Sequence, residues 1–286
     1  MTGTSIKLTE CPRDAMQGLP NFVPTDVKAA YINLLLQVGF DSIDFGSFVS
    51  PKAIPQMRDT AQVLSKLDLG NTRSKLLAII ANYKGAEDAC EHQEITYLGY
   101  PFSISETFQM RNTNTSVTNA FETVKSIREL CENKGKELLV YLSMGFGNPY
   151  GDEWNADIVS HWTERLVNEG VRIIALSDTI GIATPSQIKS IYTQLSRSFP
   201  DTEFGVHLHS TPSTWHEKVE AAYQSGCKRF DGALRGYGGC PMAKDKLTGN
   251  IATENIIGYL AQQNAPTGLN YDKLQDALDY SVRVFQ

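Results

Sequence analysis

The clearest fold signal in the chain is the segment 203-EFGVHLHSTPSTWHEKVEAAYQSGCKRFDGA-233. Its two ends, 203–209 and 227–233, are short apolar runs of the kind that form buried strands. The residues between them carry apolar side chains at helical spacing, and Gly226 follows as a helix stop. This stripe consists of Trp215, Val219, Ala222 and Tyr223. Two strands joined by a helix in this way predict a parallel pair.

The same alternation continues from this segment to both ends of the chain. Strand-like runs occur at 5–10, 41–46, 74–81, 101–106, 137–143, 171–177, 203–209 and 227–233. Amphipathic helical runs separate them, and the clearest are 27–38, which ends before Gly39, and 117–131. Eight strands interleaved with helices over 286 residues predict a (β/α)8 barrel, or TIM barrel, with residues 1–286 forming one catalytic domain.

The end of the chain adds three features to this barrel. A glycine-rich loop at 234–250 is predicted to form a flap after the eighth strand. The run 253–264 is predicted to be the eighth barrel helix, and 270–286 an additional C-terminal helix. The alternative is a doubly wound open sheet. It is less favoured, because no G-x-G-x-x-G or Walker loop follows an early strand.

Composition narrows the functional class. A net charge of −6 argues against a general nucleic-acid or membrane-surface binder, and no apolar run approaches the ~20 residues of a membrane helix. The cysteines are scattered and form no C-x-x-C pair, which indicates reduced thiols. They are Cys11, Cys90, Cys131, Cys227 and Cys240. The N-terminal segment shows no leader pattern, so we expect a cytoplasmic protein.

His207 and His209 end the seventh predicted strand and share one of its faces. In a closed barrel, the eighth strand lies between the seventh and the first. Asp14, after the first strand, is therefore expected near both imidazoles at the active-site end. Two imidazoles and a carboxylate suit a divalent metal such as Mg²⁺ or Mn²⁺. The alternative is a histidine pair that is simply hydrogen-bonded at a strand end.

Three further residues are candidates for function, each with an ordinary alternative. Arg13 beside Asp14 is either an active-site cation or half of a surface salt bridge. Cys240, in the predicted flap, is either a catalytic thiol or an inert one. Asp178, after the sixth strand, is either a functional carboxylate or a helix cap.

Taken together, these residues resemble the 3-hydroxy-3-methylglutaryl-CoA lyase family, whose wider group includes isopropylmalate and homocitrate synthases. The matching motifs span nearly the whole chain in the family's order. They are "PRDAMQ" (12–17), "SFVSPKAIPQMRD" (47–59), "SETFQMRNTN" (105–114), "SDTIGIATP" (177–185), "GVHLH" (205–209) and "GYGGCPMAKDKLTGNIATE" (236–254). The second and the last of these are specific to the lyase branch.

The resemblance implies a role for each matched position. Implied metal ligands are Asp14, His207, His209 and Asn250, the last through its amide oxygen. Arg13 would stabilise a developing enolate, and Cys240 on the flap would handle a proton. The positions implied to line the substrate pocket or to support the ligands are Gln17, Asp44, Ser47, Tyr141 and Asp178.

The implied reaction is the metal-dependent cleavage of 3-hydroxy-3-methylglutaryl-CoA to acetyl-CoA and acetoacetate, in leucine and ketone-body catabolism. The implied partners are this CoA thioester and a second copy of the chain in a homodimer, with no nucleic acid and no membrane. The residues that bind CoA do not follow from the motifs. Lys52, Arg111 and Lys244 are candidates only by charge near the barrel rim.

Some positions depart from the family pattern. Asp44 stands where glutamate is usual, Ser210 replaces an aspartate after the histidine pair, Ala15 replaces a glycine, and the flap is one residue longer. These changes leave alternatives open. One is a related 3-hydroxyacyl-CoA lyase or Claisen-type synthase. Others are a non-catalytic metal or CoA-ester binding barrel, and an iron oxygenase with two histidines and a carboxylate.

Overall fold

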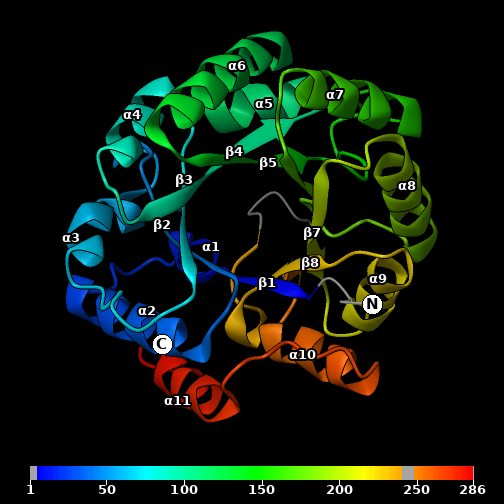
Figure 1. Cartoon of the computed structure of the whole chain (residues 1–286). Coiled ribbons are helices and arrows are strands. Elements are labelled where there is room, and N and C mark those ends of the chain that lie inside the picture. The colour runs from blue at the N-terminus through cyan, green and yellow to red at the C-terminus, as the bar shows by residue number, and fades with distance from the viewer. Residues whose placement is uncertain (1–4, 240–247, 286) are drawn as a thin grey trace.

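The computed structural model describes residues 5–239 and 248–285, and these form a closed barrel of parallel strands (Figure 1). The barrel strands are β1 (Lys7–Glu10), β2 (Ser42–Ser47), β3 (Lys75–Ile79), β4 (Ile95–Ser103), β5 (Glu137–Ser143), β6 (Ile173–Asp178), β7 (Glu203–Ser210) and β8 (Arg229–Gly232). Each strand pairs with its neighbours in sequence, β8 pairs with β1, and the β6–β7 pairing completes the ring. The predicted TIM barrel is confirmed.

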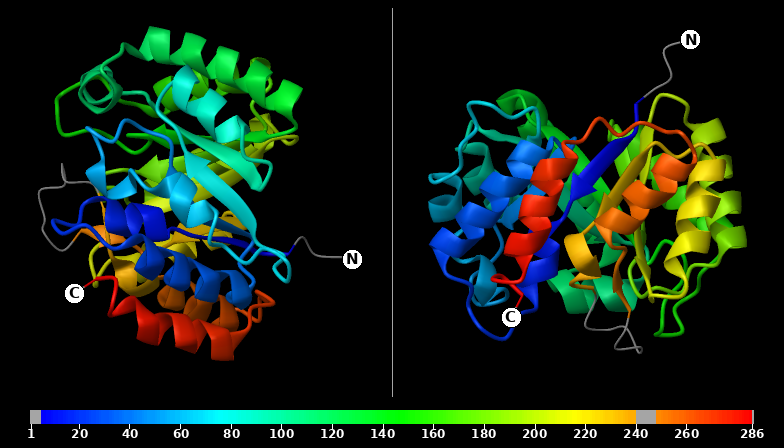
Figure 2. Two further views of the ribbon diagram at one scale, coloured as in Figure 1. Left: turned by 90° about the vertical axis from the view of Figure 1, so that its left-hand side faces the viewer. Right: turned by 90° about the horizontal axis from the view of Figure 1, so that it is seen from below.

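Helices surround the strands on the outside, as both views in Figure 2 show. The barrel helices are α2 (Thr25–Val38), α3 (Thr60–Leu64), α4 (Tyr83–Cys90), α6 (Val117–Lys134), α7 (Ala156–Asn168), α8 (Pro185–Ser198), α9 (Trp215–Gln224) and α10 (Thr253–Gln262). Shorter elements are α1 (Pro12–Gln17), η1 (Pro55–Met57), α5 (Glu106–Thr113), η2 (Leu234–Gly236) and β9 (Gly249–Asn250). None of the described helices is long and apolar enough to cross a membrane.

Two separate apolar clusters stabilise the barrel. The larger lies between the strands and the surrounding helices. The smaller fills the inside of the barrel and comes mostly from alternate residues of β3, β5 and β6. Its members are Leu77, Ile79, Tyr97, Leu139, Tyr141, Ile173 and Ala175. Because the lumen is packed below, the cavity at the barrel mouth lies at the carboxyl ends of the strands.

The additional C-terminal helix, α11 (Tyr271–Ser281), packs beside α2 at the bottom of Figure 1. The Tyr31 ring on α2 stacks on that of Tyr280, with centroids 6.4 Å apart. The predicted end of α2 is also observed. Gly39 takes a left-handed conformation with φ of 85°, which a residue without Cβ adopts at little cost.

The prediction for the fourth strand was wrong. It placed the strand at 101–106, whereas β4 covers Ile95–Ser103 and Glu106 is the first residue of α5. Gly99 and Pro101 lie within β4, and both residue types normally indicate a turn or a strand edge. Glu106 therefore does not end a barrel strand, and its Oε2 accepts a hydrogen bond from Val117 N.

Candidate metal centre and active site

Asp14 reaches the barrel mouth because the chain forms a short helix directly after β1. Pro12 occupies the first turn of α1, where its missing N–H costs nothing. The Asp14 carboxylate is buried, and it accepts hydrogen bonds from Gln17 Nε2 at 2.8 Å and from Asn250 Nδ2 at 2.7 Å. Burial alone would raise its pKa, but neighbouring Arg13 and other nearby groups lower it below its usual range.

His207 and His209 are each held by a hydrogen bond at Nδ1. His207 Nδ1 lies 3.3 Å from Asp231 Oδ2 on β8, and His209 Nδ1 lies 2.9 Å from the carbonyl oxygen of Thr179. A neutral imidazole that donates from Nδ1 keeps its lone pair on Nε2. When both rings are neutral, both Nε2 atoms, which lie 3.2 Å apart, therefore direct lone pairs into a shared space. This is the arrangement that metal-binding histidines adopt.

The pKa values of the two rings shift in opposite directions. Burial, followed by the charge of His207, lowers the pKa of His209 to about 4, so this ring is neutral at pH 7. Burial also acts to lower the pKa of His207, but the carboxylates of Asp231 and Asp14 outweigh it and raise that pKa. The carboxylates of Asp231 and Asp14 thus stabilise a positive charge at His207.

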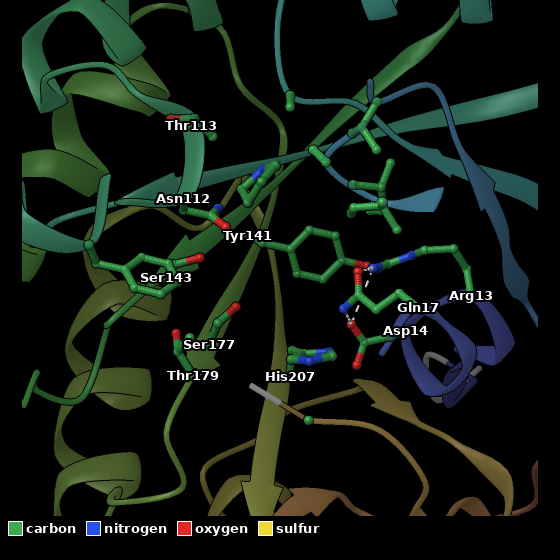
Figure 3. A pocket seen from close by; sticks show the side chains of 18 of the residues that line it. Arg13, Asp14, Gln17, Asn112, Thr113, Tyr141, Ser143, Ser177, Thr179 and His207 are labelled. Carbon is green, nitrogen blue, oxygen red and sulfur yellow. Dashed lines mark hydrogen bonds and ion pairs between the residues drawn. The ribbon is translucent and has the colours of Figure 1, made fainter. Parts of the chain in front are cut away.

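The geometry of these groups fits a divalent cation. One ligand atom from each of Asp14, His207 and His209 lies within 4.8 Å of the other two. The 3.2 Å between the Nε2 atoms matches the spacing of about 3 Å expected for two ligands at right angles around an ion ~2.1 Å away. Figure 3 shows Asp14 and His207 facing each other at the floor of a cavity.

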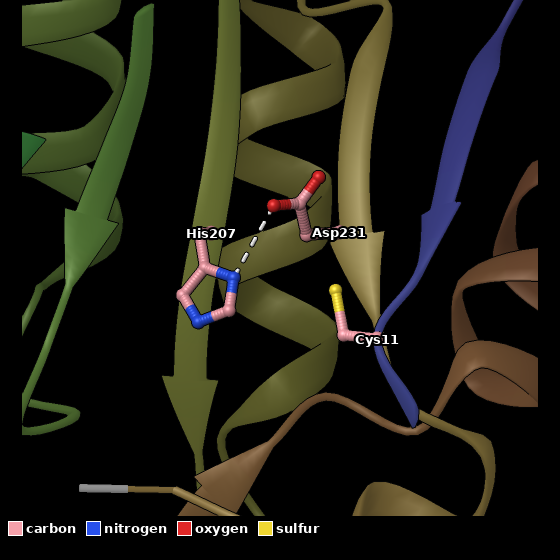
Figure 4. Close-up of side chains that lie close together, drawn as sticks. All are labelled: Cys11, His207 and Asp231. Atoms are coloured by element: carbon pink, nitrogen blue, oxygen red, sulfur yellow. Dashed lines mark hydrogen bonds and ion pairs between the residues drawn. The ribbon is translucent and has the colours of Figure 1, made fainter. Parts of the chain in front are cut away.

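A second cluster shares His207 but is a poorer metal site. Cys11, His207 and Asp231 also offer three potential ligand atoms within 4.8 Å (Figure 4). Burial, and then the negative charge of Asp231, raises the pKa of the Cys11 thiol well above its ordinary value. A neutral thiol is a poor ligand, because metals bind the thiolate. In this cluster, Asp231 acts on His207 and orients its ring.

Asn250 lies beside the proposed ligands because β9 pairs antiparallel with the end of β7. His209 is opposite Asn250, and Ser210 is opposite Gly249. The Asn250 amide nitrogen donates to Asp14 Oδ2 and, at 2.9 Å, to the Tyr237 carbonyl. This places the side chain against Asp14. Its role as a ligand through the amide oxygen stays a prediction.

Arg13 is held in place by two carboxylates and one amide. Asp44 binds it in a bidentate manner, with an Nη2–Oδ2 distance of 2.6 Å, while Nη1 donates to Asp14 and Gln17. Burial raises the pKa of Asp44 to about 6, against the opposing effect of Arg13, so Asp44 is ionised at neutral pH. Aspartate is one methylene shorter than the glutamate that the family resemblance implies here, yet the Asp44 carboxylate reaches Arg13. It orients the guanidinium and does not line the cavity.

A cavity of about 450 Å³ opens above these groups, a size typical of small-molecule sites. The predicted pocket residues Gln17 and Tyr141 line it, and Tyr141 extends toward the Arg13 side (Figure 3). The Tyr141 hydroxyl is buried and has no hydrogen-bond partner among the described residues, so it is available to a ligand. Arg111 also lines this cavity, whereas Lys52 does not.

Ser47 lies in a different place from the other predicted pocket residues. It lines a neighbouring cavity of about 360 Å³, next to the first, and Val49 borders both. The Ser47 backbone N–H donates to Thr60 Oγ1. A ligand in the first cavity is therefore not expected to contact Ser47.

Asp178 points away from the cavity, although Ser177 and Thr179 on either side line it. Its carboxylate accepts two backbone N–H groups, from Ile182 at 2.8 Å and Ala183 at 3.0 Å. It also binds Lys218 at 2.6 Å. Through these contacts Asp178 holds the loop that follows β6, and it does not line the cavity.

Two of the predicted site residues, Cys240 and Lys244, lie outside the described residues. Their proposed roles therefore stay predictions.

Sequence reasoning missed three groups that hold the histidines, namely Thr179, Asp231 and Lys218. The burial of Lys218 could have been predicted, because this residue falls three residues after Trp215 on the apolar stripe of α9. A lysine at a buried helical position needs an acidic partner. Asp231 and Thr179 act through contacts between different strands, which a single segment does not reveal.

Comparisons with known proteins agree with this site. Residues 6–280 match the sequence model of the HMGL-like family. Hydroxymethylglutaryl-CoA lyase YngG of Bacillus subtilis is 33% identical over 272 residues, covering 93% of this chain and 88% of the relative.

Solved structures give the same result. An HMG-CoA lyase from Brucella melitensis superposes with a TM-score of 0.91 at 28% identity, covering 99% of both chains. An HMG-CoA lyase from Acinetobacter baumannii, in complex with coenzyme A and 3-methylmalate, superposes with a TM-score of 0.89 at 32% identity. That match covers 98% of this chain and 91% of the other. Because the family model matches nearly the whole chain, this chain belongs to the HMGL-like family.

Proposed function

We propose that this chain is a divalent-metal-dependent carbon–carbon lyase that cleaves 3-hydroxy-3-methylglutaryl-CoA to acetyl-CoA and acetoacetate. The observation that carries the proposal is the convergence of Asp14, His207 and His209, beside Arg13, on one cavity at the barrel mouth. Relatives of this chain include lyases named for this substrate, and the structure of one of them was solved with coenzyme A bound.

The metal is proposed to be Mg²⁺ or Mn²⁺, held by Asp14, His207 and His209 with Asn250 beside them. A mixed set of carboxylate, imidazole and amide groups suits these ions. When bound, such an ion supplies Lewis acidity that makes a substrate hydroxyl easier to deprotonate. The hydrogen bonds at the Nδ1 atoms of both histidines keep their Nε2 atoms available for it.

The chain's own residues then serve the cleavage. The C3 hydroxyl loses its proton, the C2–C3 bond breaks to leave a ketone, and the electron pair passes to the acetyl-CoA enolate. Asp14 or His207 is proposed to accept this proton. Arg13, fixed by Asp44, offers a permanent positive charge to the enolate oxygen. A proton must then reach C2, and Cys240, which follows the cavity-lining Gly239, is proposed to deliver it.

The decisive experiment incubates the purified chain with 3-hydroxy-3-methylglutaryl-CoA and either Mg²⁺ or Mn²⁺ and measures acetoacetate. We expect product with at least one metal and none after chelation. Absence of acetoacetate with both metals would contradict the proposal. A panel of other 3-hydroxyacyl-CoA thioesters then tests the related substrates, since the family resemblance implies an acid at the position of Ser210.

Three variants separate the proposed roles. Arg13→Met and Cys240→Ser should each lower kcat by at least about 100-fold with metal content unchanged. His209→Ala should instead lower the bound metal, measured by elemental analysis. Full activity in Cys240→Ser would refute the proton role of this thiol.

The cellular compartment and the oligomeric state stay proposals. Four described cysteines, Cys11, Cys90, Cys131 and Cys227, are free and buried, which supports a reducing compartment such as the cytoplasm. The homodimer implied by the family resemblance is checked by light scattering on the purified chain.

A further inference from the structure

Lys218 projects from α9 into the protein interior, and its ammonium group is almost fully buried. Its side chain is 3% exposed. Nζ donates to Asp178 Oδ2 at 2.6 Å, to the His209 carbonyl at 2.8 Å and to the Gly181 carbonyl at 2.9 Å. An ammonium group has three protons, so each is used. Burying a lysine is costly, and this position therefore calls for a specific reason.

All three acceptors belong to the structure that surrounds His209. One is the backbone carbonyl of His209 itself. The other two, Asp178 and Gly181, flank Thr179, whose carbonyl accepts the hydrogen bond from His209 Nδ1. Lys218 therefore binds the backbone that carries the imidazole and also the loop that orients it.

The loop after β6 is closed around the same ion pair. While Oδ2 of Asp178 binds Lys218, Oδ1 accepts the N–H groups of Ile182 and Ala183. Gly181, with φ of 74°, comes so close to Thr248 that an added Cβ would lie 2.5 Å from its methyl group. The loop is thus held between Lys218 on one side and the residue preceding β9 on the other.

We propose that Lys218 is a positioning residue for the metal centre. Through Asp178 and the 178–183 loop, it fixes the Thr179 carbonyl, and with it the tautomer and orientation of His209. The inference rests on the proposed function only in treating His209 as a metal ligand. It also gives Asp178 its role, which is to hold this loop through Lys218 without contact with the substrate.

The chain contains a second buried lysine ion pair that serves as a matched control. Lys28 on α2 binds Asp59 at 2.7 Å, and both side chains are buried. Its further acceptor is the Gln56 carbonyl, and it makes no described hydrogen bond with His207, His209 or Asp14. Removing Lys28 therefore tests the loss of a buried ion pair without disturbance of the ligands.

The test compares Lys218→Met, the double variant Lys218→Met with Asp178→Asn, and the control pair Lys28→Met and Lys28→Met with Asp59→Asn. Lys218→Met leaves a buried carboxylate unpaired and should lower Tm strongly. The double variant removes that charge and keeps a side-chain oxygen that can accept the two backbone N–H groups of the loop, so Tm should recover. Mn²⁺ affinity, measured by the electron paramagnetic resonance of free Mn²⁺, should stay about 10- to 100-fold weaker in both Lys218 variants.

A second readout needs neither metal nor substrate. In the metal-free protein, the His209 Nδ1–H proton bonded to Thr179 should give a slowly exchanging NMR signal, detectable with ¹⁵N-labelled histidine. This signal should shift or disappear in both Lys218 variants and stay unchanged in both Lys28 variants. Lys28→Met should lower Tm, the double Lys28 variant should restore it, and both should keep the Mn²⁺ affinity of the unmodified chain.

The outcomes separate this inference from the proposed function. A double Lys218 variant with normal Mn²⁺ affinity and an unchanged His209 signal would overturn the inference. An unmodified chain that binds Mn²⁺ but forms no acetoacetate would remove the proposed substrate and leave the role of Lys218 intact. If the unmodified chain bound no Mn²⁺, the NMR signal would still decide whether Lys218 orients His209.

Discussion

At the scale of single residues, Glu10 is the clearest case of a buried acid with a measurable effect on stability. It ends β1 and is fully buried. Its Oε1 accepts a hydrogen bond from the Leu234 N–H at 2.8 Å, and its Oε2 accepts one from Thr253 Oγ1. These partners lie at the start of η2 and at the start of α10. Burial raises the pKa of Glu10 from 4.5 to about 8, so the carboxyl keeps its proton at neutral pH.

Glu10→Gln should therefore stabilise the protein at pH 8 and change little at pH 4. Below pH 4.5, the carboxyl is protonated in the folded and the unfolded chain. Between pH 4.5 and 8, only the unfolded chain releases the proton, so stability falls by up to ~4 kcal/mol as pH rises. Urea unfolding at both pH values measures this difference. Exposed Glu137→Gln is the control, and an equal loss of stability at both pH values in Glu10→Gln would contradict the prediction.

At the scale of elements, the sequence predicts long periodic segments well and short or unusual ones poorly. Seven of the eight strands lie close to their predicted positions, because parallel strands are nearly continuous apolar runs. The fourth was predicted too far along the chain, because Gly99 and Pro101 within β4 are residue types that normally indicate a turn or a strand edge. Helix α1 and strand β9 are too short to show a period, yet they carry Asp14 and Asn250. Asp14, His207 and His209 were predicted as ligands from strand alternation and barrel closure, and Asn250 from the family resemblance, whereas the groups that orient them depend on contacts between strands.

The C-terminal segment also contacts residues 235–237, at the start of the predicted flap. Tyr237 stacks on Phe285 with centroids 4.3 Å apart, and the Arg235 side chain donates to Ser281 Oγ and to the Leu278 carbonyl. Because the Tyr237 carbonyl accepts a hydrogen bond from the Asn250 amide, this contact connects the C-terminal segment to the candidate metal centre.

Phe285→Ala should loosen this connection without unfolding the barrel. We expect a loss of about 1 kcal/mol of stability and faster amide hydrogen exchange within residues 235–239, while exchange in α9 stays unchanged. Tyr271→Ala, on an exposed face of α11, is the matched control and should leave exchange at 235–239 unaltered. Equal exchange rates in both variants would show that the aromatic stack does not hold the loop.

At the scale of the whole molecule, the candidate metal centre combines residues that follow the first strand with residues of the seventh, where the barrel closes. Asp14 follows the first strand, whereas His207 and His209 come from the seventh, and β8 pairs with both β1 and β7. A cation bound by these residues requires the closed barrel, so it stabilises the folded state over the unfolded one.

Mn²⁺ at 100 times its Kd should therefore raise the free energy of unfolding by about 2.7 kcal/mol. For a chain of this size, that corresponds to an increase in Tm of roughly 5–10 °C, measured by calorimetry with and without metal. His209→Ala should lose most of this increase, because one of its converging ligands is gone, whereas Glu137→Gln should keep it. An equal increase in Tm in His209→Ala would place the stabilising Mn²⁺ outside the centre formed by Asp14, His207 and His209.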